Sequence, residues 1–317
     1  MKLIQALLRL VRWPNLVFIA LSQVLFYYCI ILPSLSEIAV AQTHQLTPGL
    51  CGWLVLASVL IAAGGYIIND YFDINIDQIN KPQKMVVERV IYRRHAMVLH
   101  AVVTLAGLVF SGWVASKTNP LLFPANLLCA LLLWFYSTRF KRELLVGNLL
   151  IALLTAWTIL VMYVAINSTR TIFLSPAGEM AAALQRVFKF AVLYGGFAFI
   201  LSLIREVVKD IEDVEGDARY DCNTIPIAWG IRSAKVFTGV WMVVLLAALL
   251  IVLFYVIQLR WWLAAAYCML CIVVPLAFLL RDFLKASEKA DYTRLSSRIK
   301  VIMLSGILSM PVFMLHA

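Results

Sequence analysis

Apolar runs long enough to cross a lipid bilayer recur along almost the whole of this 317-residue sequence. A spanning helix needs about 20 mostly apolar residues. Hydrophobic residues make up 63% of the chain and charged residues 14%, whereas soluble domains have roughly 45–50% and 25%. We therefore predict an all-α membrane protein: a single domain over residues 1–317 in which about nine transmembrane helices form one bundle. The predicted spans are residues 14–33, 50–69, 96–116, 121–137, 146–166, 187–208, 233–255, 261–281 and 299–316.

Basic residues alternate between the two sides of these spans. Loops on one side hold 22 of the 27 Lys and Arg residues, and loops on the other side hold the remaining five. Because basic loops stay in the cytoplasm, we expect a multi-pass protein of the cell (inner) membrane whose basic loops face the cytoplasm. Orientation accounts for the net charge of +10, so we expect no nucleic-acid partner. Residues 1–13, with Arg9 and Arg12 among apolar residues, predict an amphipathic segment lying at the membrane interface.

Two clusters of acidic residues share one spacing, D-x-x-D-x-x-x-D. One follows the second predicted span and the other follows the sixth, both on the predicted cytoplasmic side. Positions i, i+3 and i+7 of a helix share one face, so each cluster is predicted to form a stripe of carboxylates that extends a transmembrane helix. The members are Asn69, Asp70, Asp73 and Asp77 in the first motif, and Asp210, Asp213 and Asp217 in the second.

Carboxylates gathered in this way repel one another, and charge near a membrane is costly. Hard divalent cations offset the repulsion, because they prefer oxygen ligands. Mg²⁺ typically takes one or two carboxylates together with substrate phosphate oxygens. The paired motifs therefore predict Mg²⁺ ions that hold a diphosphate.

The combined pattern resembles the UbiA-type intramembrane prenyltransferases, and the resemblance covers nearly the whole chain. Smaller features agree with it, namely Gly64-Gly65, Asn80-Lys81-Pro82, Tyr136-Ser137 with Lys141-Arg142, and Thr224-Ile225-Pro226 with Gly230. One loop departs from the family. Lys84 stands where an Arg is usual, and two prolines are missing after it, so we expect a differently shaped loop there.

The resemblance implies Mg²⁺-dependent transfer of a prenyl group from a polyprenyl diphosphate to an acceptor. Carbon–oxygen cleavage leaves negative charge on the diphosphate, which metal ions and basic side chains stabilise. The seven motif residues named above are the implied metal ligands, with Asp70, Asp73, Asp210 and Asp213 central to catalysis. Tyr136 is implied to orient a substrate, although an interfacial aromatic anchor also explains it. The implied diphosphate ligands are Lys141 and Arg142, followed by Lys81, Lys84, Arg205 and Lys209, although membrane orientation alone also explains basic residues there.

The stretch from Arg205 to Asp217 points to the acceptor. It is similar to the branch of the family formed by the digeranylgeranylglyceryl phosphate synthases, which use a prenylglyceryl phosphate and make an ether bond. An aromatic acceptor, such as a naphthoate or hydroxybenzoate quinone precursor, is the alternative. With either acceptor, we expect the reaction to take place among membrane lipids.

Two other classes of protein share some of these features. CDP-alcohol phosphotransferases also use aspartates and Mg²⁺, but their motif has Gly directly after the first Asp, and here Val214 follows Asp213. A divalent-cation transporter would carry acidic residues near the bilayer midplane, whereas these lie at the ends of spans. Mg²⁺-dependent release of diphosphate distinguishes the enzyme from a transporter.

Overall fold

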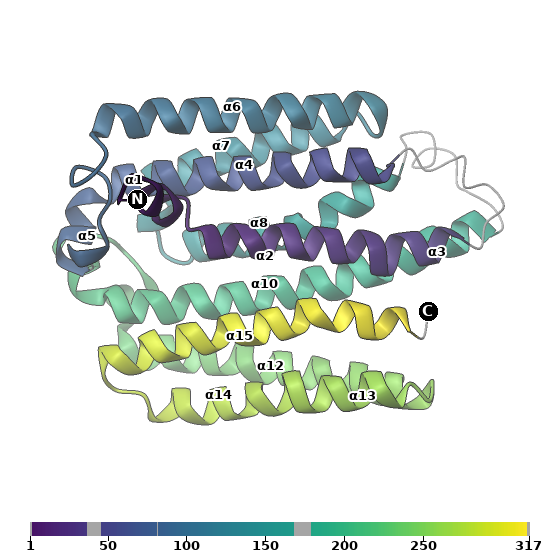
Figure 1. Cartoon of the computed structure of the whole chain (residues 1–317). Coiled ribbons are helices and arrows are strands. Elements are labelled where there is room, and N and C mark those ends of the chain that lie inside the picture. The colour runs from purple at the N-terminus through teal and green to yellow at the C-terminus, as the bar shows by residue number, and fades with distance from the viewer. Residues whose placement is uncertain (1, 37–45, 81, 168–178, 316–317) are drawn as a thin grey trace. The chain divides into compact units, whose positions relative to one another are not determined.

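The computed structural model describes residues 2–36, 46–80, 82–167 and 179–315, which form helices joined by short connections (Figure 1). Within these ranges the only β-type pairing is an isolated bridge between Val87 and Ile91, so the all-α class is confirmed. The elements are α1 (Lys2–Leu10), α2 (Trp13–Phe26), η1 (Tyr27–Ile31), α3 (Leu32–Ser36), α4 (Pro48–Phe72), α5 (Ile74–Asn80), η2 (Pro82–Lys84), α6 (Arg93–Lys117), α7 (Leu122–Thr138), η3 (Phe140–Arg142), α8 (Val146–Ile166), α10 (Glu179–Arg219), α11 (Ile225–Ala228), α12 (Gly230–Gln258), α13 (Trp262–Cys268), η4 (Met269–Val273), α14 (Val274–Lys285) and α15 (Lys289–Met314).

The predicted spans correspond to these helices one by one. In the described part of the chain, eight helical stretches are long and apolar enough to cross a membrane. The fourth predicted span corresponds to α7, an apolar helix of 17 residues. The count of nine is therefore met by eight long spans and one shorter helix. Two helices run well past their apolar runs: α10 covers Glu179–Arg219 and α15 begins at Lys289.

The chain forms two compact units. Unit 1 consists of Met1–Lys141 and Trp157–Ala191, and unit 2 consists of Arg142–Ala156 and Val192–Ala317. Helices α8 and α10 each contribute residues to both units. A single domain over the whole chain remains a prediction.

Helices α4 and α6 of unit 1 approach closely because glycines lie between them. A Cβ placed on Gly107 would be 2.9 Å from Ile61 Cγ1 and 3.1 Å from the Ala57 carbonyl oxygen. His100 Nδ1 lies 2.9 Å from the carbonyl oxygen of Gly64 on the facing helix. Small residues permit this kind of contact between membrane helices, where van der Waals packing drives association.

A buried turn joins α6 to α7. Asn119 is fully buried there, and its Oδ1 accepts a bond of 3.0 Å from the backbone N–H of Leu121. Its Nδ2 donates to the carbonyl oxygens of Val164 at 3.0 Å and Asn167 at 2.5 Å, at the end of α8. The predicted spans 96–116 and 121–137 are thus joined by a tight turn in which the side-chain amide of Asn119 is paired.

The segment predicted to lie at the membrane interface is helical. In α1, Ala6 and Leu10 are buried in a cluster with Ile67 near the end of α4, while Leu3 and Ile4 are more than half exposed. In Figure 1, α1 is viewed nearly end-on, whereas α2 runs across the picture. The position of α1 at a bilayer surface stays a prediction.

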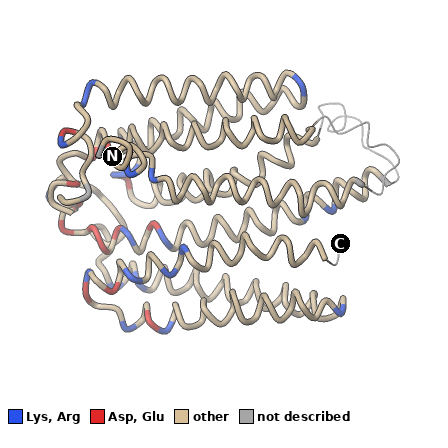
Figure 2. The backbone as a smooth tube through the Cα atoms, in the orientation of Figure 1, with Lys and Arg blue, Asp and Glu red and all other residues tan. Residues whose placement is uncertain are grey.

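Unit 2 has its own apolar core, to which α10, α12, α14 and α15 all contribute. Leu201, Leu276 and Ile299 are among its fully buried members. Tyr194 and Ser309 share a buried hydrogen bond of 2.8 Å between α10 and α15. Figure 2 shows that the acidic residues of this unit gather at one end of its helices, which is the end that carries the second aspartate motif.

Candidate active site

The first aspartate motif lies where α4 ends and α5 begins. Asn69 and Asp70 belong to the last turn of α4, Asp73 caps that helix at φ −90° and ψ 0°, and Asp77 lies in α5. The prediction of one helical stripe is therefore wrong here, because the helix is interrupted at Asp73. Backbone bonds continue through the break, from the N–H of Asp73 to Asn69 O (3.0 Å) and from the N–H of Asp77 to Asp73 O (2.8 Å). The acidic residues thus remain on successive turns.

Asp73 is buried and held by two side chains. Asn69 Nδ2 donates to Asp73 Oδ2 at 2.8 Å. Lys141, from the connection after α7, forms an ion pair with Asp73 Oδ1, and only 14% of the lysine side chain and 11% of the aspartate side chain are exposed. A predicted diphosphate ligand thus lies against a predicted metal ligand.

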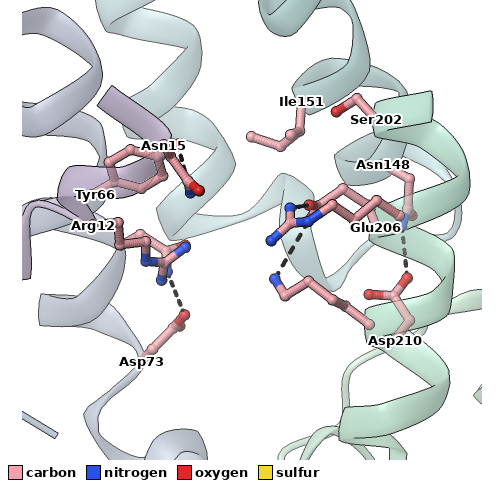
Figure 3. Close-up of polar contacts among 12 residues, drawn as sticks. Arg12, Asn15, Tyr66, Asp73, Asn148, Ile151, Ser202, Glu206 and Asp210 are labelled. Atoms are coloured by element: carbon pink, nitrogen blue, oxygen red, sulfur yellow. Dashed lines mark hydrogen bonds and ion pairs between the residues drawn. The ribbon is translucent and has the colours of Figure 1, made fainter. Parts of the chain in front are cut away.

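Asp70 is paired with Arg12, which the sequence pattern had assigned only to orientation. Arg12 has a left-handed backbone (φ 51°, ψ 52°) at the corner between α1 and α2, and its Nη2 is 2.8 Å from Asp70 Oδ1. The guanidinium lies 5.0 Å from the ring centre of Tyr66, whose hydroxyl accepts a bond of 3.2 Å from Asn15 Nδ2, as Figure 3 shows. Burial lowers the pKa of Arg12, but Asp70, Tyr66 and Asp73 together outweigh this, so the pKa lies above its ordinary value.

The second aspartate motif lies on one uninterrupted helix. Helix α10 extends to Arg219, so the stripe predicted for Asp210, Asp213 and Asp217 is confirmed by the i, i+3, i+7 geometry. Asn148, near the start of α8, donates from Nδ2 to Asp210 Oδ2 at 2.7 Å (Figure 3). Asn148 is buried, and it therefore fixes the orientation of the first carboxylate of the motif.

Glu206 lies one turn before Asp210 and forms ion pairs with two of the predicted diphosphate ligands. Arg205 Nη1 donates to Glu206 Oε1 at 2.7 Å, and Lys209 Nζ is 3.6 Å from Glu206 Oε2. Figure 3 shows Glu206 and Asp210 on the same stretch of α10. Basic side chains therefore pair with carboxylates beside the second motif, as they do at the first.

The remaining predicted residues lie at helix ends and connections. Tyr136 is half-buried in the last turn of α7. Arg142 is exposed, and its carbonyl oxygen accepts a bond of 2.8 Å from the backbone N–H of Asn223, in the segment after the second motif. Lys84 lies in η2, and Lys81 lies outside the described residues.

The donor atoms of both motifs suit a hard cation. Among the described residues no three Asp, Glu, His or Cys side chains converge as a ready-made metal site. Mg²⁺ does not require one, because it keeps several waters and takes one or two carboxylates plus substrate phosphates. The Asn69–Asp73 pair supplies an amide oxygen and a carboxylate, and Asp210 offers a carboxylate oriented by Asn148. Each motif therefore fits one Mg²⁺.

Three residues of these sites were not predicted from the sequence, although two of them carried a signal. Asn148 is a lone amide within an apolar run, and Glu206 is an acidic residue inside a predicted span. Polar residues within membrane helices usually have a function or a partner. In the sequence Arg12 is simply a basic residue next to the first predicted span. Its contact with Asp70 could not be predicted, because the two residues are far apart along the chain.

The comparison with known proteins settles the family. The UbiA prenyltransferase family matches residues 30–304 of this chain. The chain belongs to the UbiA prenyltransferase family. As a UbiA-family prenyltransferase it is a multi-pass membrane enzyme, which the helical spans above agree with.

Relatives of similar length extend the likeness across the chain. A digeranylgeranylglyceryl phosphate synthase from Sulfolobus acidocaldarius is 33% identical over 245 residues, which cover 75% of this chain and 75% of the relative. The synthase of the same name from Hyperthermus butylicus is 32% identical over 234 residues, covering 74% of this chain and 70% of the relative.

Solved structures share the fold. One, of digeranylgeranylglyceryl phosphate synthase in membranes, has a TM-score of 0.62 and 22% identity, with full coverage of both chains. Another, a UbiA homologue from Archaeoglobus fulgidus bound to GPP and Mg²⁺, has a TM-score of 0.59 and 16% identity, covering 96% of this chain and 99% of that one.

Proposed function

We propose that this prenyltransferase carries a geranylgeranyl group from its diphosphate to a prenylglyceryl phosphate, forming an ether bond, and that it depends on Mg²⁺. The observation that carries the proposal is the likeness, over about three quarters of the chain, to synthases that bear this activity in their name. The Mg²⁺ dependence is supported by the donor chemistry of the motifs and by the metal in a solved relative.

The metal ligands in this proposal are those that the motifs predict. Asn69, Asp70, Asp73 and Asp77 hold one ion, and Asp210, Asp213 and Asp217 hold the other. Bound Mg²⁺ acts as a Lewis acid that neutralises the charge growing on the leaving diphosphate. The acceptor hydroxyl oxygen bonds to the first carbon of the prenyl group, the carbon–oxygen bond to diphosphate breaks, and the hydroxyl proton is released.

The basic residues exchange partners during this cycle. In the structure Lys141 pairs with Asp73, and Arg205 and Lys209 pair with Glu206. Lys141 would bind diphosphate oxygens if Asp73 served as a metal ligand, because an ammonium group is well suited to phosphate. Arg142, Lys81 and Lys84 are further diphosphate ligands in this proposal, and Tyr136 orients a substrate.

A product assay tests the function. Purified protein in detergent is given radiolabelled geranylgeranyl diphosphate and Mg²⁺, with geranylgeranylglyceryl phosphate or 1,4-dihydroxy-2-naphthoate as separate acceptors. Label should move to the glyceryl phosphate. Transfer only to the naphthoate would overturn the proposed acceptor while leaving prenyl transfer intact, and transfer to neither would contradict the proposal as a whole.

Matched variants test the proposed metal ligands. Asp210→Asn should lower the rate by at least about 100-fold, because a neutral amide binds Mg²⁺ far more weakly than a carboxylate does. Asp282→Asn is the control: Asp282 is also an acidic residue near a helix end, but it pairs with Arg281 and Arg298, which belong to neither motif. Similar rates for the two variants would remove Asp210 from the site.

We propose further that the active site faces the cytoplasm of the cell (inner) membrane, as the distribution of basic residues suggests. With nine spans and a cytoplasmic N-terminus, the C-terminus lies outside the cytoplasm. Alkaline phosphatase fused after residue 317 should then be active, and a green fluorescent protein fused there should be dark. The reverse result would contradict either the orientation or the number of spans.

A further inference from the structure

A groove of about 780 Å³ lies in unit 2 between α12 and α14, which pack against each other (Figure 1). None of the predicted site residues line it. Val236, Val240 and Val243 of α12 form one wall and are more than half exposed. Leu280 and Leu284 of α14 form the other wall. The groove is therefore an apolar hollow on the outer surface of two membrane-spanning helices.

Gly239 forms the floor of the groove. It follows Val236 by three positions and precedes Val243 by four, so it lies on the same helical stripe as the valines. A Cβ placed on Gly239 would meet no atom within 4 Å. The hollow thus exists because one side chain is missing from an otherwise continuous apolar stripe, and no neighbouring side chain fills the gap.

The length of the groove matches one leaflet of a bilayer. Its lining on α12 extends from Ile231 to Val244, and the part beyond Lys235, from Val236 to Val244, corresponds to about 13 Å at 1.5 Å per residue. The hydrocarbon core of a bilayer is about 30 Å thick, so one leaflet contributes about 15 Å. A transmembrane helix of a partner protein would need a groove along the whole core, whereas a lipid tail needs only one leaflet.

One end of the groove is basic. Arg232 and Lys235 line it in the first turns of α12. Lys235 Nζ is held in place by the carbonyl oxygens of Leu284 at 3.0 Å and Ala286 at 2.8 Å, which uses two of the three donors of an ammonium group. Arg232 is exposed. Two cations therefore lie at the end of the apolar lining.

We propose that this groove binds an anionic phospholipid, with its phosphate at Arg232 and Lys235 and one hydrocarbon chain along Gly239. The apolar hollow does not suit water, because apolar cavities stay dry. An unfilled hollow would forfeit the dispersion contacts that a lipid chain supplies. Anionic headgroups are attracted to basic residues at the membrane surface, and each such residue strengthens binding.

Native mass spectrometry of the full chain tests this site. The protein is reconstituted in nanodiscs of equal parts dioleoylphosphatidylglycerol and dioleoylphosphatidylcholine, then transferred to mild detergent, and retained lipid is counted. The wild type should keep one phosphatidylglycerol. Gly239→Leu, which fills the groove, should lower the retained fraction at least fivefold. Arg232→Gln should bring the preference for phosphatidylglycerol over phosphatidylcholine close to one.

Two matched controls complete the experiment. Gly52→Leu makes the same substitution at another helical glycine whose added Cβ meets nothing within 4 Å, and Arg260→Gln removes a charge beyond the other end of α12. Both should retain lipid like the wild type. Three results would each overturn the proposal. The controls could lose the lipid as the groove variants do, or the wild type could retain no lipid. The third is a dimer that Gly239→Leu converts to monomer. Arg232→Gln decides the matter independently if Gly239→Leu does not fold.

Discussion

Replacing Arg12 with glutamine should strengthen metal binding in the absence of diphosphate. Arg12 Nη2 is 2.8 Å from Asp70 Oδ1, and 36% and 20% of the two side chains are exposed. A cation already resting on Asp70 competes with a divalent ion for that carboxylate. Arg12→Gln removes the competitor but keeps a polar side chain of similar length.

The exposure of the Arg12–Asp70 pair sets the size of the effect. The pair is partly buried, so the roughly 0.2–1 kcal/mol typical of exposed ion pairs is a lower bound, and 1.4 kcal/mol corresponds to a factor of ten. The dissociation constant for a divalent ion should therefore fall by at least about 1.5- to 5-fold. The rate of prenyl transfer, measured with the prenyl diphosphate donor, should fall. Arg12 released by the metal can bind the diphosphate, and losing a hydrogen bond to a charged group worth about 1.5–3 kcal/mol lowers kcat/KM roughly 10- to 150-fold.

Both effects of Arg12→Gln can be measured on the same preparation. Mn²⁺ titrations followed by electron paramagnetic resonance report metal affinity without donor, and initial rates with labelled donor report kcat/KM. Arg9→Gln is the control, because Arg9 is an exposed cation at the end of α1. Metal binding that is unchanged or weaker in Arg12→Gln than in Arg9→Gln would refute the idea that Arg12 competes for the site.

Three more outcomes are expected. Asn148→Leu removes the 2.7 Å bond to Asp210. It should lower kcat/KM about 10- to 100-fold, as happens when a residue that orients a metal ligand is lost, and leave the melting midpoint by circular dichroism unchanged. A fall in the midpoint alone would make Asn148 purely structural. Gly107→Leu would force a Cβ to within 3.1 Å of the Ala57 carbonyl oxygen and should cost about 1–3 kcal/mol or more, seen as a lower midpoint than that of Gly52→Leu. Chelation with EDTA should abolish turnover, and Mg²⁺ should restore it where Na⁺ does not; turnover in EDTA would contradict a metal-dependent reaction.

The spans could be predicted because lipid imposes a strong rule on composition. Each long apolar run became a helix, and the limits of α8 match residues 146–166 of the prediction. Hydropathy says less about helical turns outside the bilayer. The last turns of α10 were predicted from the spacing of the second motif alone, and the first turns of α15 were missed. These turns follow from local bonding instead, such as the reciprocal capping by Glu288 and Asp291 at the start of α15.

The site could be predicted in outline but not in its contacts. Spacing placed Asp210 and its partners on one helix face, because that geometry is local. The partner of Asp73, Lys141, is 68 positions away in the chain. The partner of Asp210, Asn148, is 62 positions away. Pairings over such distances are set by how the helices pack, which a single sequence does not reveal.

The turn between α6 and α7 also bears on how the protein is made. Helix α7 has 17 residues, slightly short for the bilayer core, and only four residues separate it from α6, so the two should insert as a hairpin. The amide of Asn119 finds its acceptors 45 and 48 positions later in the chain. At roughly 5–20 residues per second of synthesis, that amide waits about 2–10 s for its partners. During this interval the hairpin is incomplete, and a ribosome pause before α8 would lengthen the time for which a quality-control protease can recognise it.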